Sequence, residues 1–178
     1  MCSSDLGIQM YQAHPYKRPD IAYETIHKDG QMRILMHSDA LRHQKDKPPI
    51  LLVPSLINRS SILDINEDMS MLRWLNQQKQ NTYLLDWGNI VSNIEPKLTM
   101  EHIVAKKLHD AIEHLSDLHQ SQVHLIGYCM GGILCAGACA INPDKIARLV
   151  LLATPWDFHD KTNRSEEHTS ELQSPDHL

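Results

Sequence analysis

One hexapeptide constrains this chain more than any other feature. Residues 127–132 read Gly-Tyr-Cys-Met-Gly-Gly, after the apolar run 122–126 and before the small-residue stretch 133–141. A strand that passes through Gly-x-nucleophile-x-Gly into a helix presents the central side chain at the tip of a sharp turn. The pattern therefore predicts Cys129 as a nucleophile on a strand–turn–helix unit. The alternative is a buried structural cysteine beside unrelated glycines.

The small residues around Cys129 have a steric explanation. The turn is so sharp that Gly127 and Gly131 are needed to leave room for it, and Gly132 extends the same small-residue set. The helix that follows directs its N-terminal N–H groups at the turn, where they stabilise a thiolate and a developing oxyanion. We therefore expect residues 127–132 to form the reactive part of the molecule.

The ends of the chain differ from its middle. Residues 1–6 and 164–178 resemble read-through of a DNA-sequencing adapter, and the second segment is polar, acidic and without apolar periodicity, which predicts disorder. We interpret residues 7–163 as the authentic segment. It divides into a lead-in with a β-hairpin over 7–47 and a truncated α/β core over 48–163.

The charge balance argues against two classes of partner. The whole chain has 17 basic and 22 acidic residues, a net of −5. One basic and five acidic residues lie in the two end segments, which leaves 16 basic and 17 acidic residues, a net of −1. This balance disfavours nucleic acid and an anionic membrane surface as partners. Without a signal peptide or an apolar run of membrane-spanning length, the sequence predicts a cytoplasmic protein.

Three cysteines lie in the middle segment. Cys135 and Cys139 are four residues apart on the helix predicted after Cys129, where they fill apolar space. No pair has the spacing of zinc ligands, and we expect neither a metal nor a cofactor.

Apolar patterning predicts an alternating series of strands and helices. After an irregular lead-in over 11–20, the predicted elements are a hairpin of 21–27 and 31–37, strands at 50–53, 82–86, 122–126 and 146–153, and helices at 68–78, from Thr99 onward and at 133–141. The apolar side of the helix at 68–78 is expected to hold Met69, Leu72, Trp74 and Leu75, and that of the helix from Thr99 to hold Ile103, Leu108, Ile112 and Leu115. The series predicts an α/β fold with a mostly parallel sheet and helices on both faces.

Four segments follow predicted strands. They are residues 54–58, 86–87, 129 and 155–158. Because ligands of such sheets bind outside the carboxyl ends of the strands, we expect these segments to gather around one site.

Five blocks, in this order, resemble the polyhydroxyalkanoate synthases, a family of the α/β-hydrolase superfamily. They are residues 52–59, 62–64, 83–88, 127–132 and 153–158. The resemblance implies a partial α/β-hydrolase fold that lacks the C-terminal strands and the cap. It also implies an acyltransferase that polymerises (R)-3-hydroxyacyl-CoA thioesters on a cysteine. The implied partners are the CoA thioester, which is a substrate and not a cofactor, and the growing polyester chain. A homodimer of the full-length enzyme and a location at the polymer-granule surface are further implications.

The fold and the resemblance together assign roles at the predicted site. Cys129 is the expected nucleophile, and the backbone N–H of Met130 is expected to form half of the oxyanion hole. The other N–H should come from the loop after strand 50–53, where Ile57 is preferred over Leu56.

The catalytic acid and base are expected beyond the block at 153–158. Asp157 lies in that block and His159 follows it directly, and neither is predicted as the acid or the base. The sequence therefore predicts that the chain as given is inactive. It also predicts that strand 146–153 forms an uncovered apolar edge that promotes self-association.

Two other functions stay open. One is a cysteine-dependent hydrolase of the dienelactone hydrolase type, which would release a free acid. The other is a non-catalytic, granule-associated protein.

Overall fold

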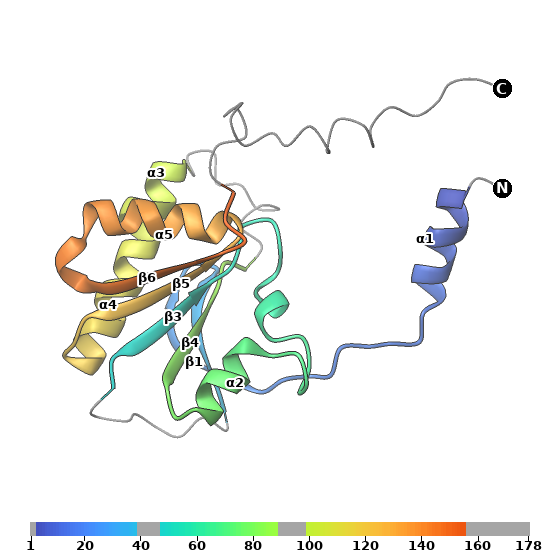
Figure 1. The fold of residues 1–178 in the computed structure, drawn as a ribbon, viewed down its shortest axis with the longest axis horizontal. Coiled ribbons are helices and arrows are strands. Elements are labelled where there is room, and N and C mark those ends of the chain that lie inside the picture. The colour runs from blue at the N-terminus through green and yellow to red at the C-terminus, as the bar shows by residue number, and fades with distance from the viewer. Residues whose placement is uncertain (1–2, 39–46, 89–98, 156–178) are drawn as a thin grey trace.

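A computed structural model describes residues 3–38, 47–88 and 99–155 (Figure 1). The predicted disorder of 164–178 and the family block residues 156–158 lie outside these ranges. No helix within them is both long and apolar enough to cross a membrane.

A six-stranded sheet forms the centre of the molecule. Its strands lie in the order β1-β2-β4-β3-β5-β6, with bounds β1 Tyr23–Asp29, β2 Met32–His37, β3 Pro49–Val53, β4 Asn81–Asp86, β5 Val123–Tyr128 and β6 Ile146–Leu152. The β3–β4, β3–β5 and β5–β6 pairs are parallel, whereas the β1–β2 and β2–β4 pairs are antiparallel. The mostly parallel α/β sheet predicted from sequence is confirmed, and so is the hairpin, whose turn contains Gly30 at a φ of +61°.

Helices cover both faces of the sheet, as predicted. The main helices are α2 Met71–Gln77, α4 His109–His119 and α5 Met130–Ile141, with short 3-10 turns η1 Ser60–Leu63 and η3 Pro143–Lys145. The helix predicted from Thr99 begins as α3 Met100–His102, passes through the π-helical segment η2 Ile103–Leu108 and continues as α4. The Thr99 hydroxyl accepts a hydrogen bond from the His102 N–H at 3.1 Å, which caps this helix.

The two faces of the sheet bury separate apolar clusters. One cluster packs η2, α4 and α5 against the strands and includes the four predicted helix residues Ile103, Leu108, Ile112 and Leu115. The other packs η1 and α2 against the opposite face through Leu63 and Leu72. Successive strand residues alternate between the clusters because side chains of a strand point to opposite faces.

Two sequence predictions need correction. The lead-in over 11–20 was expected to be irregular, but helix α1 Ser3–Ala13 extends into it and stands away from the sheet (Figure 1). The apolar side predicted for 68–78 is also partly wrong, because Met69 precedes α2 and its side chain is 58% exposed. Trp74 is exposed too, since it lies two residues after the buried Leu72 and therefore on the opposite side of α2.

Strand β6 lies at one edge of the described sheet. Its Val150 and Leu151 side chains are 45% and 46% exposed. Self-association through this edge stays a prediction.

Candidate active site

Cys129 occupies a strained turn between β5 and α5. Its φ and ψ are 53° and −127°, a combination that non-glycine residues rarely adopt. The Cys129 N–H donates to the Leu152 carbonyl at 2.8 Å, and the Cys129 carbonyl accepts from the Gly132 N–H at 2.9 Å. Such a conformation persists only where its surroundings hold it. We call residues 127–132 the elbow.

The elbow glycines are required by close backbone packing. A Cβ at Gly131 would lie 2.2 Å from the Val53 carbonyl oxygen, and one at Gly127 would lie 2.4 Å from the Gly132 Cα. A Cβ at Gly132 would lie 1.9 Å from the Thr154 Oγ1. The turn therefore fits only because these positions lack side chains.

Loops that follow three other strands meet the elbow. Gly131 approaches the Val53 and Pro54 carbonyls after β3, and the buried Trp87 after β4 donates from Nε1 to the Pro54 carbonyl at 3.0 Å. Thr154, after β6, packs on Gly132. Of the segments expected at this edge, residues 156–158 lie outside the described ranges.

The backbone N–H groups expected in the oxyanion hole differ in their bonding. Met130 is the first residue of α5, where the helix itself provides no acceptor for the N–H. The Ile57 N–H donates to the Ser55 Oγ at 3.2 Å, and the Ile57 side chain is 75% exposed. Leu56 is partly buried against the core, and no acceptor in the described part of the chain engages its N–H.

The three cysteines of the middle segment have different surroundings. Cys129 is partly exposed, whereas Cys135 is buried. Burial, and then the neighbouring Cys139, raises the pKa of the Cys135 thiol far above its usual range, and burial also raises the pKa of Cys139. Both therefore stay protonated near neutral pH, as expected of cysteines that fill apolar space.

The thiol of Cys129 has no hydrogen-bonded histidine or carboxylate within residues 3–38, 47–88 and 99–155. Asp157 and His159, which we did not predict as the acid or the base, lie outside those ranges. The identity of the acid and base stays a prediction.

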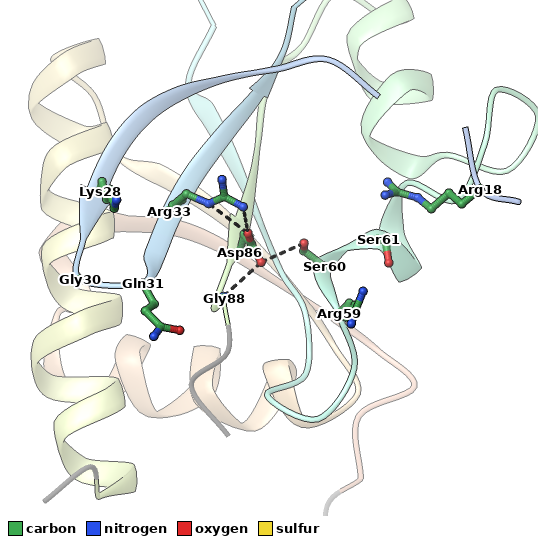
Figure 2. Close-up of a pocket in the computed structure, with 10 residues that line it drawn as sticks. All are labelled: Arg18, Lys28, Gly30, Gln31, Arg33, Arg59, Ser60, Ser61, Asp86 and Gly88. Carbon is green, nitrogen blue, oxygen red and sulfur yellow. Dashed lines mark hydrogen bonds and ion pairs between the residues drawn. The ribbon is translucent and has the colours of Figure 1, made fainter. Parts of the chain in front are cut away.

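A cationic hollow lies at the same edge of the sheet, and sequence reasoning missed it. It has a volume of about 580 Å³. We use the name cationic hollow for its lining residues, which are Arg18, Lys28, Gly30, Gln31, Arg33, Arg59, Ser60, Ser61, Asp86 and Gly88 (Figure 2). The residues come from four separate segments, and only Arg59, Asp86 and Gly88 lie within the family blocks.

Asp86 organises this hollow. Its Oδ2 accepts from the Arg33 Nη2 at 2.6 Å, and its Oδ1 accepts from the Ser60 Oγ and the Gly88 N–H, both at 3.2 Å. Figure 2 shows Arg33 and Ser60 reaching the carboxylate from opposite sides. One carboxylate thus joins β2, η1 and the end of β4.

A buried carboxylate supports the loop beside the hollow. Asp64 is fully buried and accepts a short hydrogen bond from the Tyr23 hydroxyl. Arg18 donates to the Asp64 carbonyl at 2.8 Å, and the Arg73 Nε lies 3.7 Å from the Asp64 Oδ1. Burial, followed by the hydrogen bond to Asp64, raises the pKa of Tyr23 above its usual range. This cluster ties the segment that follows η1 to β1 and α2.

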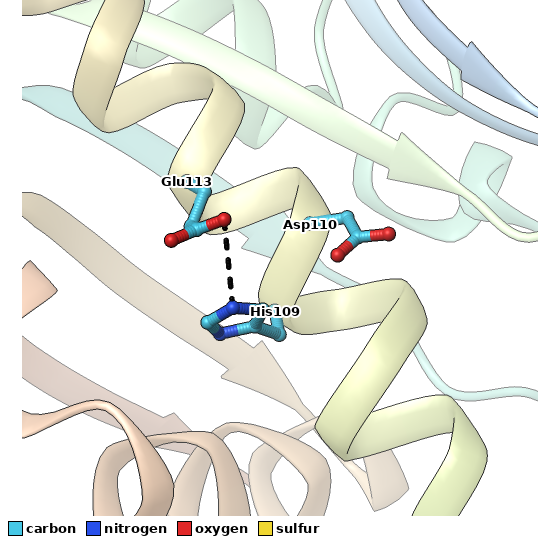
Figure 3. A group of neighbouring side chains, drawn as sticks. All are labelled: His109, Asp110 and Glu113. Carbon is cyan, nitrogen blue, oxygen red and sulfur yellow. Dashed lines mark ion pairs between the residues drawn. The ribbon is translucent and has the colours of Figure 1, made fainter.

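His109, Asp110 and Glu113 form a cluster of side chains of the kinds that bind metal ions (Figure 3). The three residues come from one helical turn, and the His109 Nε2 lies 3.5 Å from the Glu113 Oε2. Asp110 already accepts from the Lys106 Nζ at 2.5 Å. Surface pairs of this kind support a helix, so we assign no metal site here.

The fold and the elbow together define a family. The family model for the alpha/beta hydrolase fold matches residues 48–170, and this chain belongs to that family. Among curated proteins, it is similar to the poly(3-hydroxyalkanoate) polymerase subunit PhaC of Haloferax mediterranei, with 34% identity over 77% of this chain and 28% of the relative. The PhaC subunit of Thiocystis violacea is 28% identical over 79% of this chain and 39% of the relative. The chain thus spans about a third of the length of these two relatives.

Solved structures support the same fold. The mature lipase BlEst2 of Bacillus licheniformis superposes with a TM-score of 0.54 at 22% identity, covering 72% of this chain and 49% of the lipase. An epoxide hydrolase of Vigna radiata gives a TM-score of 0.53 at 16% identity, over 86% of this chain and 45% of that enzyme. At these identities the likeness shows the fold alone.

Proposed function

We propose that this chain carries the nucleophile-bearing core of a polyhydroxyalkanoate synthase-type acyltransferase, with Cys129 as the residue that accepts the acyl group. The observation that carries the proposal is the strained, glycine-enclosed turn at Cys129, in a chain whose relatives are named poly(3-hydroxyalkanoate) polymerase subunits. A cysteine at this position suits thioester substrates, since its thiolate is intrinsically nucleophilic.

The reaction on Cys129 is a balanced exchange of thioesters. The Cys129 sulfur attacks the carbonyl carbon of a hydroxyacyl-CoA, and the carbonyl oxygen becomes an oxyanion. The C–S bond to CoA then breaks, and CoA leaves as a thiolate that takes up the proton lost by the cysteine. One thioester replaces another, so the acyl group stays activated. Attack by the hydroxyl of a hydroxyacyl chain forms the ester and regenerates the thiol.

We propose that two backbone N–H groups stabilise the oxyanion. We propose Met130 as the first donor, because it begins α5 and has no intrahelical acceptor. For the second donor the bonding favours Leu56 over Ile57, since the Ile57 N–H would first have to leave the Ser55 hydroxyl. Each donor is worth on the order of a hundredfold in rate.

The experiment is to incubate the 178-residue chain with 3-hydroxybutyryl-CoA and to map the acylated peptide by mass spectrometry. We expect one acyl group on Cys129, without turnover, because the acid and base are expected beyond residue 158. Cys135→Ala is the matched control, since that thiol is buried and should not contribute. Alkylation with iodoacetamide shows separately whether Cys129 is accessible. Acylation elsewhere, or none at an accessible Cys129, contradicts the proposal.

The same sample tests the hydrolase alternative. Repeated release of free 3-hydroxybutyrate with no ester product would favour a cysteine-dependent hydrolase. Acyl-Cys129 that transfers to an added hydroxyacyl ester would favour the synthase-type reaction.

A further inference from the structure

We propose that the cationic hollow binds the phosphorylated nucleotide end of an acyl-CoA whose thioester lies at Cys129. The inference rests on the proposed function, which it extends by assigning a place to the part of the substrate that does not react. Four observations support it: the charge of the hollow, its cationic side chains without partners among the described residues, the apolar hollow beside it and its position relative to Cys129.

The charge of the hollow opposes that of the whole chain. Its lining has four cationic side chains, Arg18, Lys28, Arg33 and Arg59, and one carboxylate, Asp86, a net of +3. The chain as a whole has a net charge of −5. A concave positive region on a negative protein attracts anions locally. The phosphates of CoA are the anionic part of the proposed substrate.

Two of these cations are available to a ligand. Arg33 is occupied by Asp86, and Arg18 donates to the Asp64 carbonyl and the Tyr23 hydroxyl. Arg59 and Lys28 are exposed, and neither side chain has a hydrogen bond or an ion pair with another described residue. Guanidinium and ammonium groups suit phosphate oxygens, and the Ser61 hydroxyl lines the same hollow.

A second hollow adjoins the first and has a different character. It has a volume of about 280 Å³ and shares Arg18, Arg59 and Ser61 with the cationic hollow. Tyr16, Ile62 and Ile65 add aromatic and aliphatic surface to it. A cationic hollow beside an apolar one matches a nucleotide, whose base stacks on apolar and aromatic surface while its phosphates meet the cations. This neighbour favours a nucleotide over a simple inorganic anion.

The position of the hollow suits a substrate that extends from Cys129. Asp86 is the last residue of β4 and Gly88 follows that strand, which is separated from β5 only by β3. Two strand spacings amount to roughly 10 Å, which the pantetheine arm of CoA can span. The loop after β3 runs from the proposed oxyanion donor at Leu56 to Arg59 in the hollow. A single loop would thus contact both ends of the substrate.

Binding of S-methyl-CoA to the 178-residue chain, measured by titration calorimetry, tests the assignment without acyl transfer. S-methylpantetheine, which has no phosphate, should bind at least tenfold more weakly. The double variant Arg59→Gln/Lys28→Gln should weaken S-methyl-CoA binding about tenfold, which corresponds to ~1.4 kcal/mol, and leave S-methylpantetheine unchanged. Raising the salt concentration should reduce the difference between the two proteins.

The matched control is Arg148→Gln, which removes an exposed cation from β6 on the far side of the sheet order. It should bind S-methyl-CoA as the unsubstituted chain does. Because neither the Arg59 nor the Lys28 side chain has a hydrogen bond or an ion pair with a described residue, the double variant should also melt at an unchanged temperature.

Three results would overturn the assignment. They are equal binding of S-methyl-CoA by the double variant and the unsubstituted chain, equal affinity for S-methyl-CoA and S-methylpantetheine, and binding of inorganic tripolyphosphate as tight as that of S-methyl-CoA. A loss of S-methyl-CoA affinity in Tyr16→Ala, with tripolyphosphate affinity unchanged, would support the nucleotide. Acylation of Cys129 is measured separately, so binding without acylation contradicts only the proposed function, and acylation without phosphate-dependent binding contradicts only this assignment.

Discussion

The elbow and the cationic hollow lie at the same edge of the sheet but are held by different forces. The elbow is fixed by backbone atoms in close contact, with glycines where no Cβ would fit. The hollow is assembled from side chains of four segments around the Asp86 carboxylate. A backbone-limited turn tolerates almost no substitution, whereas a side-chain assembly should tolerate several. Because the two regions are held by different forces, the reactivity of Cys129 and the charge of the hollow can be changed independently.

The largest expected effect is at the elbow. Gly131→Ala should destabilise the fold by about 3 kcal/mol or more, because its Cβ would lie 2.2 Å from a backbone oxygen that cannot move aside easily. Gly137→Ala, on the same helix, is the control, since its Cβ would meet only the Val104 side chain at 3.2 Å. That change should stay within about 1 kcal/mol. Urea unfolding measures both, and equal losses would contradict the backbone-limited account.

The next largest effect is expected at the buried Asp64, which supports the loop beside the cationic hollow. Asp64→Ala should cost about 3 kcal/mol, since it removes a buried carboxylate that bonds Tyr23 and faces Arg73. Glu67→Ala removes another carboxylate next to Arg73, but one whose side chain is 81% exposed. It should cost less than about 0.5 kcal/mol. Thermal unfolding distinguishes the two, and a neutral Asp64→Ala would show that this cluster does not stabilise the fold.

A smaller effect is expected within the hollow itself. Asp86→Asn should cost about 1 kcal/mol, because the ion pair with Arg33 is partly exposed, at 45% and 15% for the two side chains. Arg33→Gln should cost a similar amount, and the double variant should cost less than the two losses together. Strict additivity in this double-mutant cycle would mean that the two side chains contribute independently.

The smallest expected effect is a pH dependence of stability that involves the strand before the elbow and not the hollow. Desolvation, and then Arg148, lowers the pKa of His124 on the strand that leads to the elbow. In the folded state the pKa of His124 lies below the ordinary value of 6.5. The neutral histidine therefore contributes stability above pH 6.5, and this contribution is lost as the pH falls through the folded pKa. Stability should decline by less than about 1 kcal/mol as the pH falls from 7 toward 5.

His124→Gln should flatten that decline, which urea titrations at several pH values would detect. Anion binding in the hollow should be the same in His124→Gln and in the unsubstituted chain, because His124 does not line the hollow. A decline that is unchanged in His124→Gln would show that other groups cause it.

The sequence predicted the central fold because its signals are local. The apolar run at 50–53, the Thr99 cap and the four buried residues after it follow simple periodicities, and each was confirmed. The turn at Cys129 was recognisable because Gly-x-Cys-x-Gly between a strand and a helix is a sequence pattern typical of this kind of sharp turn.

The remaining features depend on contacts between distant segments. Trp74 fits an apolar pattern, yet a helix as short as α2 directs only part of that pattern to the sheet. The hollow joins residues from Arg18 to Gly88, so no single window of sequence shows it. The predicted role of Ile57 stays untested, and its hydrogen bond to the Ser55 hydroxyl is a contact that no pattern of residues shows.

The role of Cys129 is measured most directly by the amount of CoA released when the chain is mixed with 3-hydroxybutyryl-CoA. We expect a burst that approaches one equivalent of CoA per chain, lost in Cys129→Ala and retained in Cys135→Ala. Equal release by Cys129→Ala and the unsubstituted chain would contradict the assignment of Cys129 as the acyl acceptor.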